Sequence, residues 1–198
     1  MKAFISMKKI NIQKSLRPTT GKVREALFDI LQSRIKGERF LDLYAGTGAV
    51  GIEALKKGAS SVVFVEAVKR NAKKIDEDLI KYNYSDRAEV VSRKALPFIE
   101  WAELHGYSFD MIFMDPPYHT EDIMLTLNAI GSSSILGKDG LVIAEHFKKR
   151  NLPEKFVKLQ KLRDYNYGDT VLSFYELTSD SQEHDSSEMQ NSQEALDE

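Results

Sequence analysis

The sequence predicts an α/β protein whose sheet is mostly parallel, with helices on both faces and an antiparallel hairpin at its C-terminal end. Two observations indicate this class. Apolar strand patterns alternate with amphipathic helix patterns over residues 40–130, as in right-handed β-α-β crossovers. Residues 156–162 and 170–177 then alternate polar and apolar side chains about a turn at Gly168, which is typical of a hairpin. The patterns amount to seven strands.

Composition predicts one folded domain with two flanks of opposite charge. A chain of 198 residues with 42% hydrophobic content can bury one good core. Residues 1–39 hold 10 Lys or Arg against 3 Asp or Glu, whereas residues 179–198 hold 7 acidic residues and no Lys or Arg. We therefore expect a basic arm at residues 1–16, a domain at 17–178 and a disordered acidic tail from 179. A basic front end is suited to binding a polyanion.

The sequence contains neither cysteine nor a long apolar segment. The lack of cysteine excludes a disulfide framework and a thiolate zinc site, and it fits a reducing compartment. No apolar run approaches the roughly 18 residues that a membrane-spanning helix needs, and the run at residues 3–6 is too short for the core of a signal peptide. We therefore expect a cytoplasmic protein with no membrane partner. We also expect a monomer and no metal site.

The first helix is expected just after a proline. Pro18 disfavours helical angles at Arg17, and the two threonines that follow offer N-cap hydroxyls. Apolar side chains then recur at helical spacing, which predicts a helix to about residue 34. Lys22 and Arg24 lie on its polar side. They could face a polyanion next to a cofactor, or they could be ordinary charges on a docking helix.

A glycine-rich turn joins the first predicted strand, residues 40–44, to the helix that follows it. Gly46, Gly48 and Gly51 have the spacing G-x-G-x-x-G. Such a turn lets a ligand approach the backbone amides at a helix N-terminus. The same spacing occurs in dinucleotide-binding proteins, so the turn alone leaves the cofactor open.

Two acidic residues bear on the choice of cofactor. Asp42 lies in the strand before the glycines, where its charge would repel a pyrophosphate and attract the ammonium and sulfonium of S-adenosylmethionine. Glu66 lies at the end of the second strand, 20 residues after Gly46, where a carboxylate can accept both hydroxyls of a ribose. Asp42 therefore favours S-adenosylmethionine, whereas Glu66 suits either cofactor.

The β-α alternation continues beyond the glycine turn. Its predicted elements are a strand at 61–66, a helix at 68–82, a strand at 87–92, a helix at 95–104 and a strand at 109–114. Ligands of doubly wound sheets bind outside the carboxyl ends of the strands. The residues that follow each strand are therefore expected to meet at one edge.

The fourth strand runs straight into Asp115-Pro116-Pro117-Tyr118. Prolines cannot continue the hydrogen-bond ladder, so the carbonyl groups here can point into the crevice. The exocyclic amine of a nucleic-acid base is a poor nucleophile, because its lone pair is delocalised into the ring. An Asp115 carboxylate and a Pro116 carbonyl that both accept from this amine would hold its lone pair toward an incoming methyl group. Tyr118 could stack on the base once it is flipped out.

Residues beyond this motif complete the sheet. A helix is expected at residues 123–130 and a fifth strand at 140–146, which ends in Glu145 and His146. We interpret His146 as a polar strand end rather than as a contact to phosphate or substrate. A basic loop at residues 148–150 should lie at the same carboxyl edge.

These motifs in this order, over residues 15–177, resemble the bacterial small-subunit ribosomal RNA guanine-N2 methyltransferase family. The matching segments are Arg17-Pro18-Thr19-Thr20, VREALF from Val23, DLYAGTGAVGIEAL from Asp42, VEAVKRNA from Val65, FDMIFMDPPY from Phe109, Glu145-His146 and Tyr167-Gly168-Asp169-Thr170. The resemblance implies a Rossmann-like class I methyltransferase fold with a seven-stranded sheet. It implies S-adenosylmethionine as cofactor and ribosomal RNA as partner, within the small subunit or its assembly intermediate.

The resemblance also assigns roles to individual residues. It places the cofactor on Asp42, Ala45, Gly46, Gly48, Glu66 and Ala95. It makes Asp115, Pro116 and Tyr118 catalytic, and it directs Arg17, Thr19, Lys22, Arg24 and Pro117 to the RNA. One position departs from the family, since Lys94 stands where members usually carry an aspartate near the adenine.

Three other functions remain open from the residues. A DNA adenine-N6 methyltransferase shares the Asp-Pro-Pro-Tyr chemistry, but no base-reading insertion is obvious. A ribosome-assembly factor that binds RNA without methylating it would be consistent with Lys94. A nicotinamide dehydrogenase is the weakest candidate, because it leaves the double proline unexplained. We expect an enzyme that methylates the N2 amine of a guanine in small-subunit ribosomal RNA.

Overall fold

A computed structural model describes residues 21–118 and 120–178 of the chain. The predicted arm and tail, together with Arg17 and Thr19, lie outside these residues. The helices are α1 (Gly21–Leu31), α2 (Ala49–Lys56), α3 (Lys69–Lys81), the short η1 (Ser85–Arg87), α4 (Ala95–Leu104) and α5 (Asp122–Ser132). The strands are β1 (Arg39–Asp42), β2 (Ser61–Val65), β3 (Ala88–Val91), β4 (Phe109–Met114), β5 (Leu136–Phe147), β6 (Lys155–Phe156), β7 (Leu159–Tyr167) and β8 (Thr170–Leu177).

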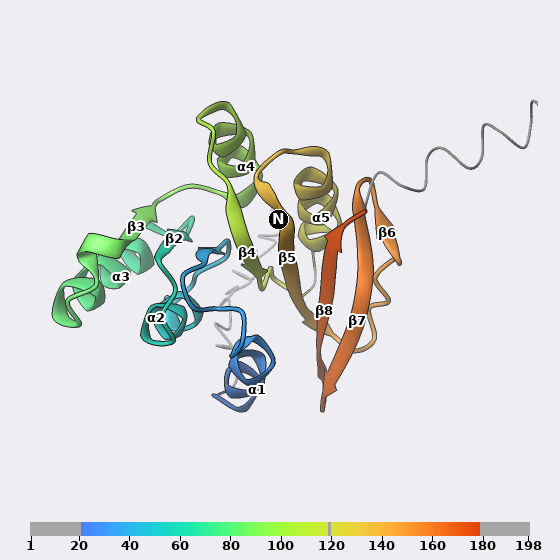
Figure 1. The fold of residues 1–198 in the computed structure, drawn as a ribbon, viewed down its shortest axis with the longest axis horizontal. Coiled ribbons are helices and arrows are strands. Elements are labelled where there is room, and N and C mark those ends of the chain that lie inside the picture. Colours follow the sequence, from blue (N-terminus) through green and yellow to red (C-terminus); the bar gives the residue numbers. More distant parts are fainter. Residues whose placement is uncertain (1–20, 119, 179–198) are drawn as a thin grey trace, which may run out of the picture.

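All eight strands of the described chain form one sheet in the order β3-β2-β1-β4-β5-β8-β7-β6 (Figure 1). The first five strands in this order are parallel, and the last three are joined by antiparallel pairing. The predicted fold class is therefore confirmed. The chain reverses its order between β1 and β4, which is the switch point where such sheets bind ligands.

The sheet has one strand more than the seven predicted. The segment expected as a single strand at 156–162 is divided into β6 and the start of β7, which pair through Phe156 and Leu159. Val157 between them has a positive φ of 51°. A β-branched residue is unusual in this conformation, so no local pattern pointed to the turn. The reversal lets Phe156 pack under α5 as part of the core.

Two apolar cores lie on opposite faces of the sheet. Buried residues of α1, α2 and α3 pack on one face, and those of α4 and α5 pack on the other. Successive residues of the central strands alternate between the two cores, as in a sheet covered on both sides. This phase decides which side chains at the strand ends share a face.

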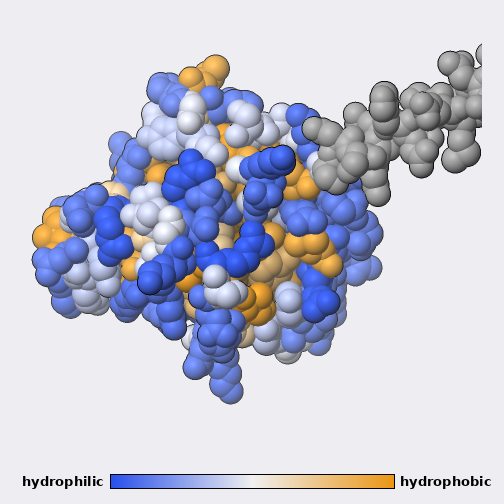
Figure 2. Space-filling model, viewed as in Figure 1, coloured by the Kyte–Doolittle hydropathy of each residue, from blue (hydrophilic) through white to orange (hydrophobic). Residues whose placement is uncertain are grey.

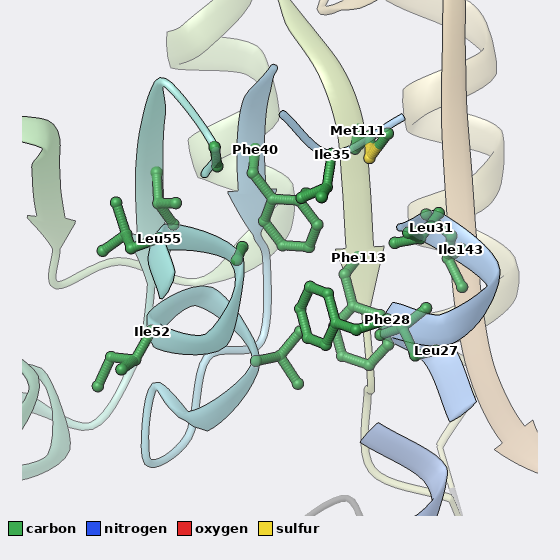
Figure 3. Packing of buried hydrophobic residues seen from close by; sticks show 14 of the residues in the cluster. Leu27, Phe28, Leu31, Ile35, Phe40, Ile52, Leu55, Met111, Phe113 and Ile143 are labelled. Atoms are coloured by element: carbon green, nitrogen blue, oxygen red, sulfur yellow. The ribbon is translucent and has the colours of Figure 1, made fainter. Parts of the chain in front are cut away.

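Helix α1 is part of the first core. Figure 3 shows Phe28 beside Phe113 of β4, whereas Ile35, just beyond the helix, lies toward Met111 of the same strand. Because Phe113 is nearer than Met111 to the carboxyl end of β4, the N-terminus of α1 is directed toward the carboxyl edge of the sheet. The helix ends at Leu31, three residues before the predicted end, and a turn follows it.

Hydrophilic side chains cover most of the surface seen in Figure 2, with smaller hydrophobic patches between them. Within the part of the chain that the structure describes, no helix has the length and apolar character that crossing a bilayer requires.

Candidate active site

Four acidic residues meet at the carboxyl edge of the sheet. Asp42 ends β1, Glu66 follows β2, Asp115 follows β4, and Glu145 lies near the end of β5. Asp42 pairs with Phe113, two residues before Asp115, so both acids belong to the face that α1 to α3 cover. Glu145 follows Ile143 of the same core by two residues. One face of the sheet thus gathers the acids around the switch point.

The glycine turn has the conformation that its residues predict. Gly46 and Gly48 have φ values of +56° and +75°, which L side chains rarely adopt, and Gly48 precedes α2. At Gly51 the reason for glycine is packing, because a Cβ there would lie 2.2 Å from a ring carbon of Phe64. The turn therefore brings backbone close to the edge where a ligand would bind.

Glu66, which follows the neighbouring strand β2, stabilises this turn through hydrogen bonds. Its Oε2 accepts a hydrogen bond from the amide of Gly46 at 2.8 Å, and its Oε1 accepts one from the amide of Val68 at 2.7 Å. A carboxylate has about four acceptor sites, so both oxygens can also accept ribose hydroxyls. The amide of Ala45, next in the turn, donates to the carbonyl of Val65 at 3.0 Å.

Asp42 is buried beneath the start of α2. Its Oδ2 accepts a hydrogen bond from the amide of Gly51 at 2.9 Å, and only 2% of the residue is exposed. Burial raises the pKa of Asp42 to about 7; the Gly51 hydrogen bond lowers it, and the charge of Glu66 raises it. The group is thus poised to ionise beside a cation near neutral pH.

Asp115 is in a similar position on the next strand. Its pKa is raised to about 8, first by burial, then by the negative charges of Glu145 and Asp42. Carboxylates that raise one another's pKa in this way mark a place where a positive charge or several hydrogen-bond donors would be stabilised.

Tyr118 lies against the end of β5. Its hydroxyl donates to Oε1 of Glu145 at 3.4 Å, and its ring centroid is 6.4 Å from that of Phe147. Burial, with the charges of Asp115 and Glu145, raises the pKa of Tyr118, so its hydroxyl stays protonated. A small hollow with a volume of about 10 Å³ opens here, lined by Pro116, Pro117, Tyr118, Ile123, Glu145, His146, Phe147 and Arg150.

His146 contacts structural partners, in agreement with its interpretation as a strand-end side chain. It is 4% exposed, and its Nε2 lies 2.8 Å from the hydroxyl of Ser173. That hydroxyl donates to Asp164 at 2.5 Å. Burial lowers the pKa of His146. The side chain is therefore neutral and held to β8, on the sheet face opposite to Glu145.

The remaining predicted residues are placed around this centre. Ala95 is the buried first residue of α4, which starts beyond the end of β3, and the exposed Lys94 precedes it. Lys22 and Arg24 lie in the first turn of α1, and this end of the helix is the one directed toward the carboxyl edge of the sheet. In the described ranges 21–118 and 120–178, no three His, Asp or Glu side chains are grouped to hold a metal ion.

Glu145 and Phe147 were not assigned roles from the residues alone, and Arg150 was expected at this edge only as part of the basic loop at residues 148–150. All three line the hollow beside Asp-Pro-Pro-Tyr. Their position depends on the pairing of β5 with β4, which no local pattern reports. The signal that was available is the acidic residue at the end of an otherwise apolar strand.

The hydrogen-bond acceptors and negative charges at this edge suit S-adenosylmethionine. Glu66 can accept from a ribose, and the glycine turn presents backbone without side chains. The buried Asp42 and the half-buried Asp115 offer negative charge to a cation, whereas they would oppose a pyrophosphate.

Comparison with known proteins gives the same picture. The model of the family described as Conserved hypothetical protein 95 matches residues 5–176. A Bacillus subtilis protein named "Putative rRNA methyltransferase YlbH" is 34% identical over 161 residues, which is 81% of this chain and 88% of that protein. Ribosomal RNA small subunit methyltransferase D of Haemophilus influenzae is 32% identical over 149 residues, 74% of this chain and 77% of that enzyme.

A solved structure agrees with the sequence relatives. A hypothetical protein from Thermus thermophilus superposes with a TM-score of 0.72 at 30% identity, covering 87% of this chain and 94% of the other.

Proposed function

The chain belongs to the family of Conserved hypothetical protein 95 and the ribosomal RNA small subunit methyltransferase D proteins, and from this premise we propose that it methylates the N2 amine of a guanine in small-subunit ribosomal RNA. The relatives are named as rRNA methyltransferases, and the acceptors and charges of the site suit S-adenosylmethionine as the methyl donor of an rRNA methyltransferase. The observation that carries the finer proposal is the meeting of Asp115, Pro116 and Tyr118 with the glycine turn at one sheet edge.

The residues of the turn would hold the cofactor. S-adenosylmethionine supplies an electrophilic methyl group bound to a positively charged sulfur. Glu66 would accept the ribose hydroxyls while it keeps the amides of Gly46 and Val68 in place. Asp42, held by the amide of Gly51, and Asp115 would stabilise the positive charge of the cofactor. Ala45, Gly48 and Ala95 would line the walls, where small residues leave room for the ligand.

The Asp-Pro-Pro-Tyr segment would prepare the amine. The Asp115 carboxylate and the Pro116 carbonyl oxygen would each accept one N–H of the guanine amine, which directs its lone pair at the methyl group. S-adenosylmethionine would supply the methyl group for the new N–C bond, and the electron pair of its C–S bond would stay on sulfur. The amine then gives one proton to Asp115, whose raised pKa suits it as an acceptor near neutral pH.

Cations near the edge would hold the RNA backbone. Lys22 and Arg24 of α1, the basic residues 148–150 and the arm with Arg17 and Thr19 would contact phosphates, and Pro117 would contact the flipped nucleotide. One domain at 17–178, without a separate target-reading module, would rely on the shape of a structured RNA. We propose the small subunit or its assembly intermediate as that substrate, and a monomeric cytoplasmic enzyme.

Transfer of labelled methyl tests the proposal. The purified protein would be incubated with methyl-labelled S-adenosylmethionine and, in parallel, with unmethylated small subunits, naked ribosomal RNA and unmethylated DNA, and the labelled nucleoside would be identified after digestion. We expect N2-methylguanosine, strongest from the particle. Label in N6-methyladenine from DNA would contradict the proposal, and so would the absence of both label and cofactor binding, which would favour a non-catalytic assembly factor.

The Asp115→Ala substitution tests the role given to the amine acceptor. It removes the carboxylate that aligns the amine, so we expect kcat to fall by about 10²-fold or more. Because S-adenosylhomocysteine carries no sulfonium charge, its affinity, measured by calorimetry, should stay close to the wild-type value. Full activity in this variant would rule out the proposed mechanism.

A further inference from the structure

We propose that Glu145 is a specificity-determining residue that accepts the N1–H of the target guanine while Asp115 and Pro116 hold the adjacent N2 amine. This inference rests on the proposed function and deepens it, because it names what would distinguish guanine from adenine at this site. It is argued from strand register, burial and the donor pattern of the base.

Strand register places the two carboxylates side by side. Met114 of β4 pairs with Ala144 of β5 in a parallel ladder. Glu145 is the next residue of β5, and Asp115 is the first residue after β4; neighbouring strands lie about 4.8 Å apart in a sheet. The charge of Glu145 also raises the pKa of Asp115, as expected of near neighbours. A planar base edge that reaches Asp115 therefore meets Glu145 as well.

The burial of Glu145 suits it to recognise a bound base rather than to act as a surface charge. Only 2% of it is exposed, yet it lines the hollow next to Pro116 and Tyr118. The Tyr118 hydroxyl donates to its Oε1 at 3.4 Å, a long contact that still orients the carboxylate. A carboxylate accepts several donors at once, so it can take this hydroxyl and a base N–H together.

The base chemistry then selects guanine. The Watson–Crick edge of guanine carries two neighbouring donor groups, N1–H and N2–H₂. In adenine the N6 amine is flanked instead by N1, which has a lone pair and no hydrogen. Two adjacent carboxylates match the first edge, whereas the second would place a lone pair against the buried charge of Glu145. DNA adenine methylation is thus opposed at the same residue.

A target analogue tests this reading. Small subunits would be rebuilt with guanosine or with 2-aminopurine riboside at the mapped target. The analogue keeps the amine but presents N1 as an acceptor. The wild type should prefer guanosine in kcat/KM by about 10²-fold or more, since sites built for a hydrogen bond reject partners that lack it. In Glu145→Gln, whose amide can also donate, the preference should fall to within about tenfold.

Two matched variants separate recognition of the base by Glu145 from other roles of this residue. Glu121→Gln makes the same change at an exposed residue beside the hollow, paired with Arg150 at 3.4 Å, and should keep the wild-type preference. Tyr118→Phe removes the hydroxyl that contacts Glu145 but leaves the ring, and it should also keep most of the preference. If Tyr118→Phe lost the preference as Glu145→Gln does, Glu145 would act only by positioning Tyr118, and the proposal would be overturned.

Binding provides a second measurement. The affinity of each variant for the two particles, taken with S-adenosylhomocysteine present, should show the same change in preference even if Glu145→Gln transfers methyl slowly. An unchanged preference in Glu145→Gln, with N2-methylguanosine still formed by the wild type, would overturn this inference alone. Absence of N2-methylguanosine from the wild type would overturn the proposed function with it.

Discussion

At the scale of single residues, the site is defined by carboxyl groups that are costly to bury. Asp42 is 2% exposed, and its pKa is raised to about 7. The pKa of Asp115 is raised to about 8. A raised carboxyl pKa means that the folded protein favours the neutral form. These groups therefore make the fold less stable as pH rises from about 4, where they ionise in the unfolded chain, to about 8. A bound cation, for which the cofactor is the natural source, reverses this cost.

This linkage predicts a pH-dependent choice between cofactor and product. S-adenosylmethionine is positively charged at sulfur and S-adenosylhomocysteine is not. As pH rises from 6 to 9, Asp42 and Asp115 ionise, and affinity for S-adenosylmethionine should rise relative to that for S-adenosylhomocysteine by about tenfold. Calorimetry at several pH values measures the ratio. Asp115→Asn should reduce the rise, and a ratio that is flat in the wild type would contradict the assignment.

At the scale of elements, β1, the glycine turn and α2 act as one unit. Asp42 in the strand accepts from Gly51 in the helix, and Glu66 of the neighbouring strand accepts from Gly46 in the turn. The ring of Phe64 lies against the backbone of α2 at Gly51. The position of the turn is therefore set by packing as much as by its own flexibility, which prepares it for a ligand before the ligand arrives.

Gly51→Ala tests this unit. The added Cβ would lie 2.2 Å from a Phe64 ring carbon, so we expect the free energy of unfolding to fall by about 1–3 kcal/mol through overpacking. Chemical denaturation measures the change. Gly21→Ala, where a Cβ would meet nothing within 4 Å, serves as the control and should cost little. Adding Phe64→Leu should recover part of the loss; no recovery would mean that the cause lies elsewhere.

At the scale of the whole molecule, charge is separated along the chain. Residues 1–39 carry a net charge of +7, from 10 basic against 3 acidic residues, while residues 179–198 carry 7 acidic residues with no Lys or Arg. The described part of the basic segment includes α1, whose first turn is directed at the carboxyl edge. An RNA phosphate chain at that edge would therefore meet cations on the same side as the site.

Neutralising α1 tests this arrangement. Lys22→Ala with Arg24→Ala removes two cations, so the KM for the ribosomal particle should rise. The slope of log KM against log salt concentration should decrease by about one to two, because fewer counterions are released. Transfer assays between about 50 mM and about 200 mM salt measure both. S-adenosylhomocysteine affinity should not change. Lys73→Ala on α3, an exposed lysine paired with Glu77, is the matched control, and an equal effect there would argue against a local RNA-binding surface.

Local interactions along the chain place the residues that the sequence predicted. Contacts between distant segments place the residues that it did not predict. Helix α4 and strand β4 were predicted at their observed bounds, because apolar period and turn chemistry act within a few residues. The turn at Val157 was not predicted. Tertiary packing of Phe156 holds Val157 at a positive φ, which a β-branched residue disfavours. Glu145 and His146 could not be distinguished by pattern, being neighbours with similar polarity.

The sequence by itself determined the fold class, the glycine turn, and the acidic and Asp-Pro-Pro-Tyr segments that strand ends present, because each depends on short-range periodicity and backbone chemistry. Only the tertiary structure decided which acids meet. The pairing of β4 with β5 sets the phase that directs Glu145 to the face of Asp42 and Asp115, and His146 to Ser173 on the other. A shift of one residue in register would exchange them, and register is fixed by contacts between segments far apart in the chain.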